Sequence, residues 1–446
     1  MTSNATYNIS VFGLGKLGSP LAAVLAGAGH HVIGVDKNER FVAAINDAKA
    51  PVEEPGLPEA VAANAHNLRA TLDYEEAVLS SDVSFIIVPT PSLADHTFDN
   101  SFLIAALEDI GAALKQKSGY HLVSIVSTVM PGSTDGVLKE ALEKTSGRQV
   151  GSDELGLCYN PEFIALGNVI NSMRKPDFLL VGESDRKAGD FLSEVRLSSC
   201  VPGTPVRRMN FINAEITKIA INTYVTTKIS YANMLAELCE QTPHADVDTV
   251  TNTVGSDSRI GTKYLKGAVG YGGPCFPRDN KAFAAFGAER DVSCTLAEAT
   301  DTVNNRQIDR IVNRLQDHVQ NGAKVCVLGL AYKDGTSEVD ESQGVLVCKA
   351  LEREGYHVSA HDPLATSTAK HQLQDSDVDI TDDLKQALES CSAALIMLPL
   401  AAYSDVPHIM EEVGRDGAVL IDPWRFMQHE DTEKVRVIPM GKHKVS

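Results

Sequence analysis

Cys275 lies in a segment whose composition fits neither a regular helix nor a regular strand. The segment, VGYGGPCFPRDN at residues 269–280, places the thiol between a glycine pair and two prolines. Irregular loops on rigid scaffolds often carry reactive groups, whereas most cysteines are small buried hydrophobes. Lys263, Lys266 and Arg278 make the surroundings cationic, which favours the thiolate. A reactive thiol is therefore one interpretation of Cys275, and a packed loop cysteine is the other.

Three glycines near the N-terminus have the spacing of a dinucleotide-binding turn. Gly13, Gly15 and Gly18 form G-x-G-x-x-G between a β-rich run and an alanine- and leucine-rich run. This spacing permits a tight turn, close approach of a pyrophosphate and close packing of helix on strand. Asp36 ends the next strand, where a carboxylate can bind a ribose and repel a 2′-phosphate. The pattern predicts an NAD site that disfavours NADP, and the alternative is a simple tight turn.

A long helix is predicted in the middle of the chain. Residues 213–241 contain neither glycine nor proline, and Pro243 helps to end the run. Lys218 and Asn222 are four residues apart, so they share a helix face that can present a cation and an amide to a ligand. A solvated surface lysine is the alternative interpretation of Lys218.

With NAD, an activated thiol indicates aldehyde chemistry, because a hemithioacetal can lose a hydride.

The last third of the chain repeats the plan of the first. AKVCVLGLAYKDGT is similar to the first strand and its glycine turn, and GYHVSAHDP is similar to GHHVIGVDK. Such internal similarity indicates a second domain of the same kind. We expect an α/β protein with two Rossmann-like doubly wound domains joined by a long central helix.

Composition and charge exclude several classes of protein. The 446 residues are too many for one core, and 43% hydrophobic with 22% charged residues is ordinary for a globular protein. A net charge of −19 opposes binding to nucleic acid or anionic membranes. The sequence shows no signal-peptide or membrane-span pattern, and its eight cysteines lack C-x-x-C spacing. We expect a cytoplasmic protein with reduced thiols and no metal site.

Separated motifs along nearly the whole chain resemble the UDP-glucose/GDP-mannose dehydrogenase family. They are VFGLGKLGSPLA, EPGL, VPTP, STVMPGST, NPEF, AEITKIAINTY, RIGTKYLKGAVGYGGPCFPRD and GLAYKDGTSE. Members of the family are NAD-dependent enzymes that oxidise the C6 alcohol of a nucleotide sugar to the carboxylate. The segment RIGTKYLKGAVGYGGPC is most similar to that of the UDP-glucose 6-dehydrogenases.

The resemblance implies a role for each matching position. Cys275 is the nucleophile, and Lys218 stabilises oxyanion charge with Asn222 near the reacting oxygen. Residues that order or activate water are Thr128, Glu162 and Asp279. Residues implied to bind NAD are Gly13, Gly15, Lys16, Leu17, Gly18, Asp36, Pro89, Thr90, Thr128 and Arg278. Residues implied to bind the substrate are Glu162, Phe163, Lys218, Asn222, Arg259, Tyr264, Leu265, Lys266, Gly272, Lys333 and Arg425. The alternatives are that Thr128 and Glu162 satisfy turn backbone and that Asp279 is a solvated charge.

The resemblance also implies three parts and an assembly. They are an NAD-binding domain at residues 1–207, a central helical region for dimerisation and the active site at 208–310, and a sugar-nucleotide-binding domain at 311–446. We expect a homodimer or higher homo-oligomer that serves polysaccharide biosynthesis.

The implied reaction is a four-electron oxidation through a cysteine thiohemiacetal and thioester. UDP-glucose is the leading substrate, and a UDP-N-acetylhexosamine or GDP-mannose is the alternative. Three departures from the family pattern blur that choice: Leu166 replaces a common second glutamate, Asp340 replaces an arginine directed at NAD, and Arg425 is shifted in DPWR. Remote alternatives are a single-step β-hydroxyacid dehydrogenase and a non-catalytic NAD or sugar-nucleotide binding protein.

Overall fold

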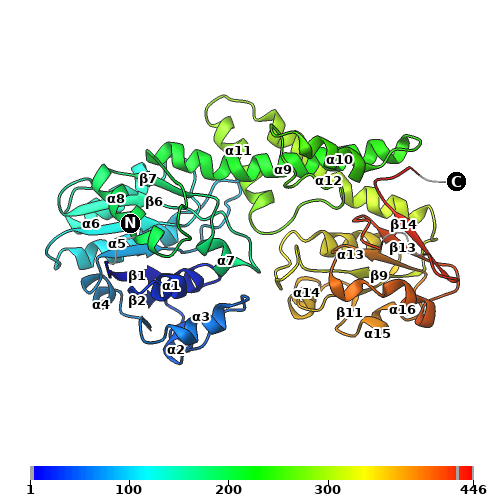
Figure 1. Ribbon diagram of the computed structural model, residues 1–446, viewed down its shortest axis with the longest axis horizontal. Helices are drawn as coiled ribbons and strands as arrows, with labels where there is room; N and C mark the ends of the chain where they lie inside the picture. The colour runs from blue at the N-terminus through cyan, green and yellow to red at the C-terminus, as the bar shows by residue number, and fades with distance from the viewer. Residues whose placement is uncertain (1–4, 428–430, 444–446) are drawn as a thin grey trace. The chain divides into compact units, whose positions relative to one another are not determined.

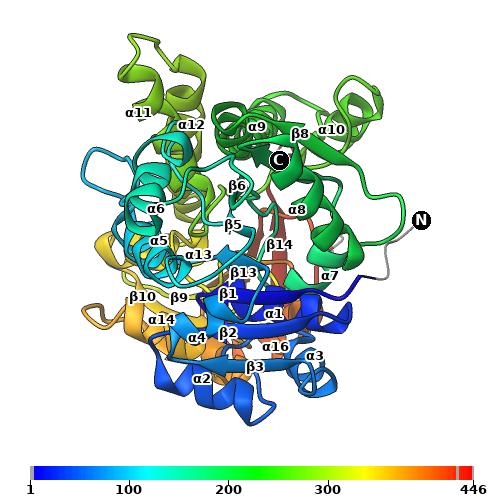
Figure 2. The same ribbon diagram turned by 90° about the vertical axis from the view of Figure 1, so that its left-hand side faces the viewer.

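The computed structural model describes residues 5–427 and 431–443, in two compact units that divide after Ala220 (Figure 1). The first unit contains an eight-stranded sheet in the order β3-β2-β1-β4-β5-β6-β7-β8. The strands are β1 (Asn8–Phe12), β2 (His31–Val35), β3 (Leu68–Thr71), β4 (Val83–Ile86), β5 (His121–Ile125), β6 (Leu155–Tyr159), β7 (Leu179–Glu183) and β8 (Val206–Met209). Figure 2 shows β1, β2 and β3 side by side. The first six strands have the order of a dinucleotide-binding fold, in which ligands bind beyond the carboxyl ends of the strands.

Helices cover both faces of this sheet, as the continuous burial of its parallel strands requires. They are α1 (Gly18–Gly27), α2 (Glu39–Asn46), α3 (Leu57–Ala63), α4 (Tyr74–Leu79), α5 (Ser101–Leu114), α6 (Lys139–Ser146), α7 (Val169–Arg174) and α8 (Arg186–Ser198), with a π-helical turn at Thr134–Leu138. Strand β1 serves both cores, because Ile9 and Val11 enter one cluster and Phe12 enters the other. All strand pairs are parallel except β6 with β7.

The predicted long helix is α9 (Phe211–Gln241), which spans 31 residues. It is followed by α10 (Val247–Ser256), α11 (Phe276–Ala288) and α12 (Thr295–Gln316). Although α9 is long, none of the described helices has the length and apolar character needed to cross a membrane.

The second unit contains a six-stranded parallel sheet in the order β11-β10-β9-β12-β13-β14. Its strands are β9 (Lys324–Leu328), β10 (His357–His361), β11 (Asp379–Thr381), β12 (Ala393–Ile396), β13 (Ala418–Asp422) and β14 (Val435–Pro439). Its helices are α13 (Gln343–Arg353), α14 (Thr366–Gln372), α15 (Leu384–Leu388) and α16 (Val406–Val413). This order repeats that of the first six strands, which confirms the predicted pair of Rossmann-like sheets with a long central helix.

Candidate active site

The glycine turn after β1 has the form that a dinucleotide requires. Gly13 has φ +93°, and a Cβ there would collide with the carbonyl oxygen of Ile87. A Cβ on Gly18 would collide with the carbonyl oxygen of Gly13. At Gly15, by contrast, an added Cβ would have no described atom within 4 Å apart from those of Gly15 itself and its two chain neighbours. The fold itself therefore explains Gly13 and Gly18, whereas the open space at Gly15 fits a pyrophosphate that approaches the backbone.

Asp36 lies where the adenosine ribose of NAD would bind. One carboxylate oxygen accepts a hydrogen bond from the Leu14 backbone N–H at 2.7 Å, and the other accepts from the Asn38 N–H at 2.8 Å. The side chain is half-buried, and a carboxylate has further acceptor sites for ribose hydroxyls. The residues of this turn therefore fit NAD.

The equivalent acid of the second unit is arranged differently. Asp362 is 1% exposed and accepts four backbone hydrogen bonds, from Leu330, Ala331, Leu364 and Ala365. All four are 2.8 or 2.9 Å long. Because both oxygens are committed to the backbone, this carboxylate holds its own loops together. The second sheet therefore lacks the ribose-binding feature of the first.

The loops after β4 and β5 carry the other predicted NAD residues of the first unit. Pro89 and Thr90 follow β4, and the Thr90 hydroxyl donates to the carbonyl oxygen of Thr128 at 2.7 Å. Thr128 follows β5, so these loops leave the same edge of the sheet as the glycine turn. Within that turn, Lys16 is exposed and Leu17 is half-buried.

Lys218 is buried, so the surface-lysine interpretation is wrong. The side chain is 6% exposed, and its ammonium donates to the carbonyl oxygen of Glu162 at 2.9 Å. The ammonium also lies 4.9 Å from the centre of the Phe163 ring, which attracts a cation. A carbonyl and an aromatic face thus hold this charge without neutralising it.

The carboxylate of Glu162 is paired with Arg196 on α8. The two atoms are 2.5 Å apart, and the Arg196 and Glu162 side chains are 1% and 7% exposed. Removing one partner of a buried pair typically costs about 3–5 kcal/mol. The alternative is that the Glu162 side chain accepts hydrogen bonds from the backbone of its own turn. The contact in the structure is instead with the Arg196 guanidinium. Sequence reasoning missed Arg196, since no motif marks it and only its burial beside Val195 reveals it.

Two further acidic residues hold the loops at this edge of the sheet. Glu54 of EPGL accepts from the N–H groups of Gly167 and Val169, each at 2.8 Å. Glu215, fully buried on α9, accepts from Gly132 at 2.6 Å and from Thr134 at 2.8 Å. Burial raises the pKa of Glu215, and these hydrogen bonds offset only part of the rise. Both motif acids therefore position loops.

In the second unit, Cys275 stands at the start of α11. It is exposed, and it is the N-cap residue of the helix. Its carbonyl oxygen accepts from the Asp279 N–H at 2.8 Å. The positive end of a helix dipole stabilises a thiolate there.

Asp279 is fully buried, so its interpretation as a solvated loop charge is wrong. One carboxylate oxygen accepts from the Asn222 amide at 2.6 Å, and the other accepts from Arg278 at 3.1 Å. The structure thus brings together Asn222, Arg278 and Asp279. Lys218 and Asn222 occupy successive turns of α9.

The predicted substrate residues of the RIGTKYLKG segment differ in exposure. Arg259 is exposed and pairs with Asp257. Tyr264 is 50% exposed with φ +66°, and Leu265 is buried. Lys266 lies 3.8 Å from Asp248. The structure therefore places Arg259, Tyr264 and Lys266 where a solute can reach them.

The remaining predicted substrate residues lie elsewhere in the second unit. Gly272 packs so closely that an added Cβ would collide with the carbonyl oxygen of Glu341. Lys333 is half-buried in the loop after β9. Among the departures from the family pattern, Leu166 packs at the margin of a first-unit core, and the Asp340 carbonyl accepts from the Gly273 N–H at 2.9 Å.

Arg425, which the resemblance implies contacts the sugar nucleotide across a subunit boundary, is engaged within its own unit. Its side chain is 2% exposed and forms a bidentate pair with Asp248, at 2.7 and 3.0 Å. It also donates to the carbonyl oxygens of Pro423 and Met440. Burial raises the pKa of Asp248, but the hydrogen bonds and charge of Arg425 outweigh it, so the pKa is lowered.

The strand order, the glycine turn and the ribose acid define the first unit as an NAD-binding domain. Comparison with family profiles is more specific. The UDP-glucose/GDP-mannose dehydrogenase family matches through its NAD binding domain at residues 7–197, its central domain at 212–306 and its UDP binding domain at 326–429. The chain belongs to this family of NAD-dependent nucleotide-sugar dehydrogenases.

Individual relatives cover most of the chain. It is 36% identical over 392 residues to UDP-glucose 6-dehydrogenase AglM of Haloferax volcanii, covering 87% of this chain and 90% of that one. It is 29% identical to GDP-mannose 6-dehydrogenase of Pseudomonas aeruginosa, covering 96% and 99%. A solved UDP-glucose dehydrogenase from Pyrobaculum islandicum superposes with a TM-score of 0.88 at 30% identity, covering 100% and 99%.

Proposed function

We propose that this enzyme oxidises UDP-glucose to UDP-glucuronate in two successive hydride removals on a cysteine-bound intermediate. The observation that carries the proposal is the exposed thiol of Cys275 at the N-terminus of α11. An aldehyde is a poor hydride donor until a nucleophile adds to it, and a thiolate is such a nucleophile. A reactive thiol has no use in a single-step alcohol dehydrogenase, so it favours the four-electron reaction.

The proposed roles come from the resemblance to the family, and the contacts of the side chains support them. NAD, when bound, accepts one hydride in each oxidation. Lys218, a buried cation without a carboxylate partner among its described contacts, stabilises negative charge on the C6 oxygen. Asn222 binds the same oxygen. Cys275 forms a carbon–sulfur bond to the aldehyde, and oxidation of that adduct gives a thioester.

Water then cleaves the thioester, returning the proton to the thiol and leaving the carboxylate. Thr128, Glu162 and Asp279 are the proposed residues that order this water. Both carboxylates are already held by cationic or amide groups, Glu162 by Arg196 and Asp279 by Asn222 and Arg278. Because these contacts hold both carboxylates in place, we propose that they act as fixed hydrogen-bond acceptors that orient the water. The contacts argue against a role as freely moving bases.

The proposed substrate rests on the relatives. The UDP-glucose 6-dehydrogenase of Haloferax volcanii and the UDP-glucose dehydrogenase of Pyrobaculum islandicum favour UDP-glucose. The GDP-mannose 6-dehydrogenase of Pseudomonas aeruginosa keeps GDP-mannose as the second candidate. The match to the UDP binding domain of the family over residues 326–429 supports a nucleotide sugar as the substrate.

We also propose that the protein is a cytoplasmic homodimer that serves polysaccharide biosynthesis. Its proposed parts are the NAD-binding domain at residues 1–207, the central helical region at 208–310 and the sugar-nucleotide-binding domain at 311–446. Support for the dimer comes from α9, where Tyr224, Tyr231 and Leu238 are 63%, 48% and 57% exposed. Because these residues are seven apart, they form one apolar stripe along the helix. We call these three residues the α9 stripe.

The test compares the parent with Cys275→Ala on a panel of sugar nucleotides with NAD. The parent should release two NADH per UDP-glucose and form the uronate, whereas Cys275→Ala should form none at an appreciable rate. Cys294→Ala is the matched control, because Cys294 is also a helix N-cap residue in the second unit. Circular dichroism checks that the variants fold. One NADH per substrate in the parent, or uronate from folded Cys275→Ala at the parent rate, would refute the proposal.

A further inference from the structure

The chain that leads to the thiol runs very close to the helices around it. At Gly270, an added Cβ would lie 2.5 Å from Oε1 of Gln343 and 2.7 Å from Oδ1 of Asn304. At Gly267, an added Cβ would collide with the carbonyl oxygen of Ala232 on α9. Glycine is required at both positions because side-chain oxygens occupy the space at Gly270 and a backbone carbonyl occupies it at Gly267. The loop is therefore held against three helices: α9, α12 and α13.

The first hold on the loop comes from Asn233 on α9, which is fully buried. Its Oδ1 accepts from the Ala268 N–H at 2.8 Å, and its Nδ2 donates to the Val269 carbonyl oxygen at 3.0 Å. The Asn233 carboxamide thus satisfies one backbone N–H and one backbone carbonyl of the loop. In a sheet, a neighbouring strand would provide these hydrogen bonds.

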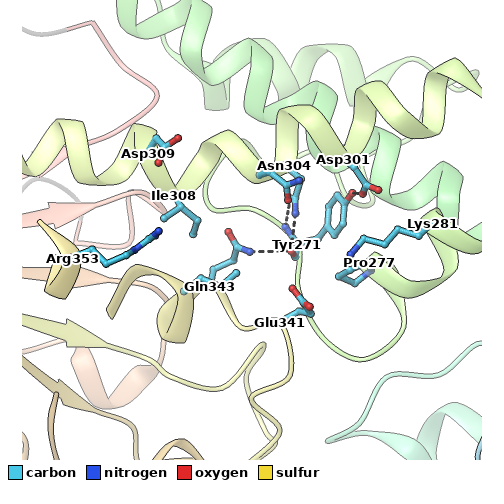
Figure 3. A pocket seen from close by; sticks show the side chains of 12 residues that line it. Tyr271, Pro277, Lys281, Asp301, Asn304, Ile308, Asp309, Glu341, Gln343 and Arg353 are labelled. Atoms are coloured by element: carbon cyan, nitrogen blue, oxygen red, sulfur yellow. Dashed lines mark hydrogen bonds between the residues drawn. The ribbon is translucent and has the colours of Figure 1, made fainter. Parts of the chain in front are cut away.

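The second hold comes from Asn304 on α12 and Gln343 on α13, which are 6% and 7% exposed. Asn304 accepts from the Tyr271 N–H at 2.7 Å and donates to the Tyr271 carbonyl oxygen at 3.1 Å. Gln343 donates to the same carbonyl oxygen at 3.1 Å. Figure 3 shows both amides directed at the Tyr271 backbone, beside a pocket of about 270 Å³. The Tyr271 hydroxyl donates to Asp301.

These holds end a short distance before the thiol. Tyr271 is four residues from Cys275, and the intervening Gly273 N–H donates to the Asp340 carbonyl oxygen at 2.9 Å. Beyond Cys275 the chain is fixed again, because Asp279 in the first turn of α11 is bonded to Asn222. Cys275 is thus an exposed residue with hydrogen-bonded residues on both sides of it in the chain.

We propose that Asn233, Asn304 and Gln343 form a carboxamide clamp that positions Cys275 at the N-terminus of α11. The clamp residues are positioning residues, since they act through the backbone of residues 268–271. The clamp's importance for turnover rests on the function proposed above, in which Cys275 attacks an aldehyde. When the clamp is loosened, the thiol leaves the helix end that stabilises its thiolate, and the aldehyde escapes before capture.

The test uses Asn304→Asp in the full-length protein. This substitution keeps the acceptor for the Tyr271 N–H but places an oxygen opposite the Tyr271 carbonyl oxygen, where Nδ2 now donates. The matched control is Asn305→Asp, the same substitution at the exposed neighbouring position. A second variant, Gln343→Met, removes one hydrogen bond at nearly constant volume. Oε1 of Gln343 is a buried acceptor without a partner among the described residues. Replacing it with an apolar group should therefore cost little folding stability.

The first measurement is alkylation of Cys275 by iodoacetamide without substrate or cofactor, followed by peptide mass spectrometry. At about pH 7, Asn304→Asp and Gln343→Met should react at least about fivefold more slowly than parent and control, because a free thiol ionises only near pH ~8.5. At about pH 9.5 the difference should shrink, since all the thiols are then ionised. Rates within twofold of Asn305→Asp at both pH values in folded variants would overturn the proposal.

The second measurement is the partition of the intermediate during turnover with UDP-glucose. The clamp variants should release free aldehyde and fewer than two NADH per substrate, whereas a general loss of stability would lower both oxidations without changing that ratio. An unchanged ratio with no aldehyde would overturn the clamp. Failure of the proposed function itself would show separately, in the parent stoichiometry and in Cys275→Ala, and the alkylation comparison would still decide the clamp.

Discussion

Lys218 is the residue whose position most directly favours chemistry. Its ammonium is buried and held by the Glu162 carbonyl and the Phe163 ring. A carbonyl dipole stabilises the cation without cancelling its charge, so the charge remains available to an oxyanion. A lysine with a purely structural role would more commonly be paired with a carboxylate.

We predict that Lys218→Met lowers kcat by about a hundredfold or more, because the cation that stabilises charge in the transition state is lost. Methionine keeps most of the buried volume, so the dissociation constant for NAD should hardly change. Steady-state kinetics and calorimetric titration measure the two quantities. Lys144→Met, at an exposed position on α6, is the control. An unaltered kcat in folded Lys218→Met would leave Lys218 with a structural role only.

Asp36 is the residue from which we predict the cofactor preference. Its carboxylate is held by the Leu14 and Asn38 backbone, and a 2′-phosphate would face it in a half-buried place. We predict that kcat/KM for NAD exceeds that for NADP by about a hundredfold or more, since like charges repel strongly where water is scarce. Asp36→Asn should reduce the preference. Lys37 is adjacent in sequence, and comparable efficiencies with both cofactors would show that it compensates for the acid.

At the scale of elements, β5 begins with a fully buried histidine. The ring of His121 contacts Ser84 on β4 at 2.9 Å and the Lys117 ammonium at 3.2 Å. Burial lowers the pKa of His121 well below 6.5, and the charge of Lys117 lowers it further. The pKa of Lys117 falls to about 8, mainly through burial. The folded protein thus keeps an uncharged His121 within its NAD-binding sheet.

We predict that this histidine makes stability fall in acid. The pKa of His121 is about 6.5 in the unfolded chain and well below that value in the folded chain. Below pH 6.5 the unfolded chain therefore binds a proton at His121 and the folded chain does not, so the free energy of unfolding decreases as pH falls. One such proton contributes about 1.4 kcal/mol per pH unit. His121→Asn should therefore show a shallower loss than the parent between about pH 6.5 and pH 5 in denaturant titrations. Parallel curves would indicate that His121 protonates in the folded state.

The elements were predictable because their causes are local. Glycine spacing gave the turn at Gly13, and a run without glycine or proline gave α9 to within a few residues of its bounds. The contacts that place the candidate site residues were not predictable. The Arg196 ion pair, the burial of Asp279 and the Asp248 pairing of Arg425 all join residues far apart in sequence. Only the fold determines such pairs.

At the scale of the whole molecule, the proposed ligands are anionic although the protein carries a net charge of −19. The net charge therefore does not attract them to the protein. Binding must depend on short-range groups: the glycine turn after β1, and cations such as Lys266 at an exposed position. Such local groups bind phosphates through directed hydrogen bonds, which are less sensitive to salt than a diffuse field.

The α9 stripe predicts how two chains associate. Large apolar side chains at seven-residue intervals favour packing against a second helix, and Tyr231 is the central member. We predict that the parent has twice the chain mass of 47.9 kDa and that Tyr231→Glu shifts it towards monomer, because two unpaired carboxylates would be buried at the interface. Light scattering after size-exclusion chromatography measures the mass. Leu364→Glu, at a site 57% exposed away from α9, is the control. A monomeric parent, or a dimer that Tyr231→Glu leaves intact, would exclude the stripe as the interface.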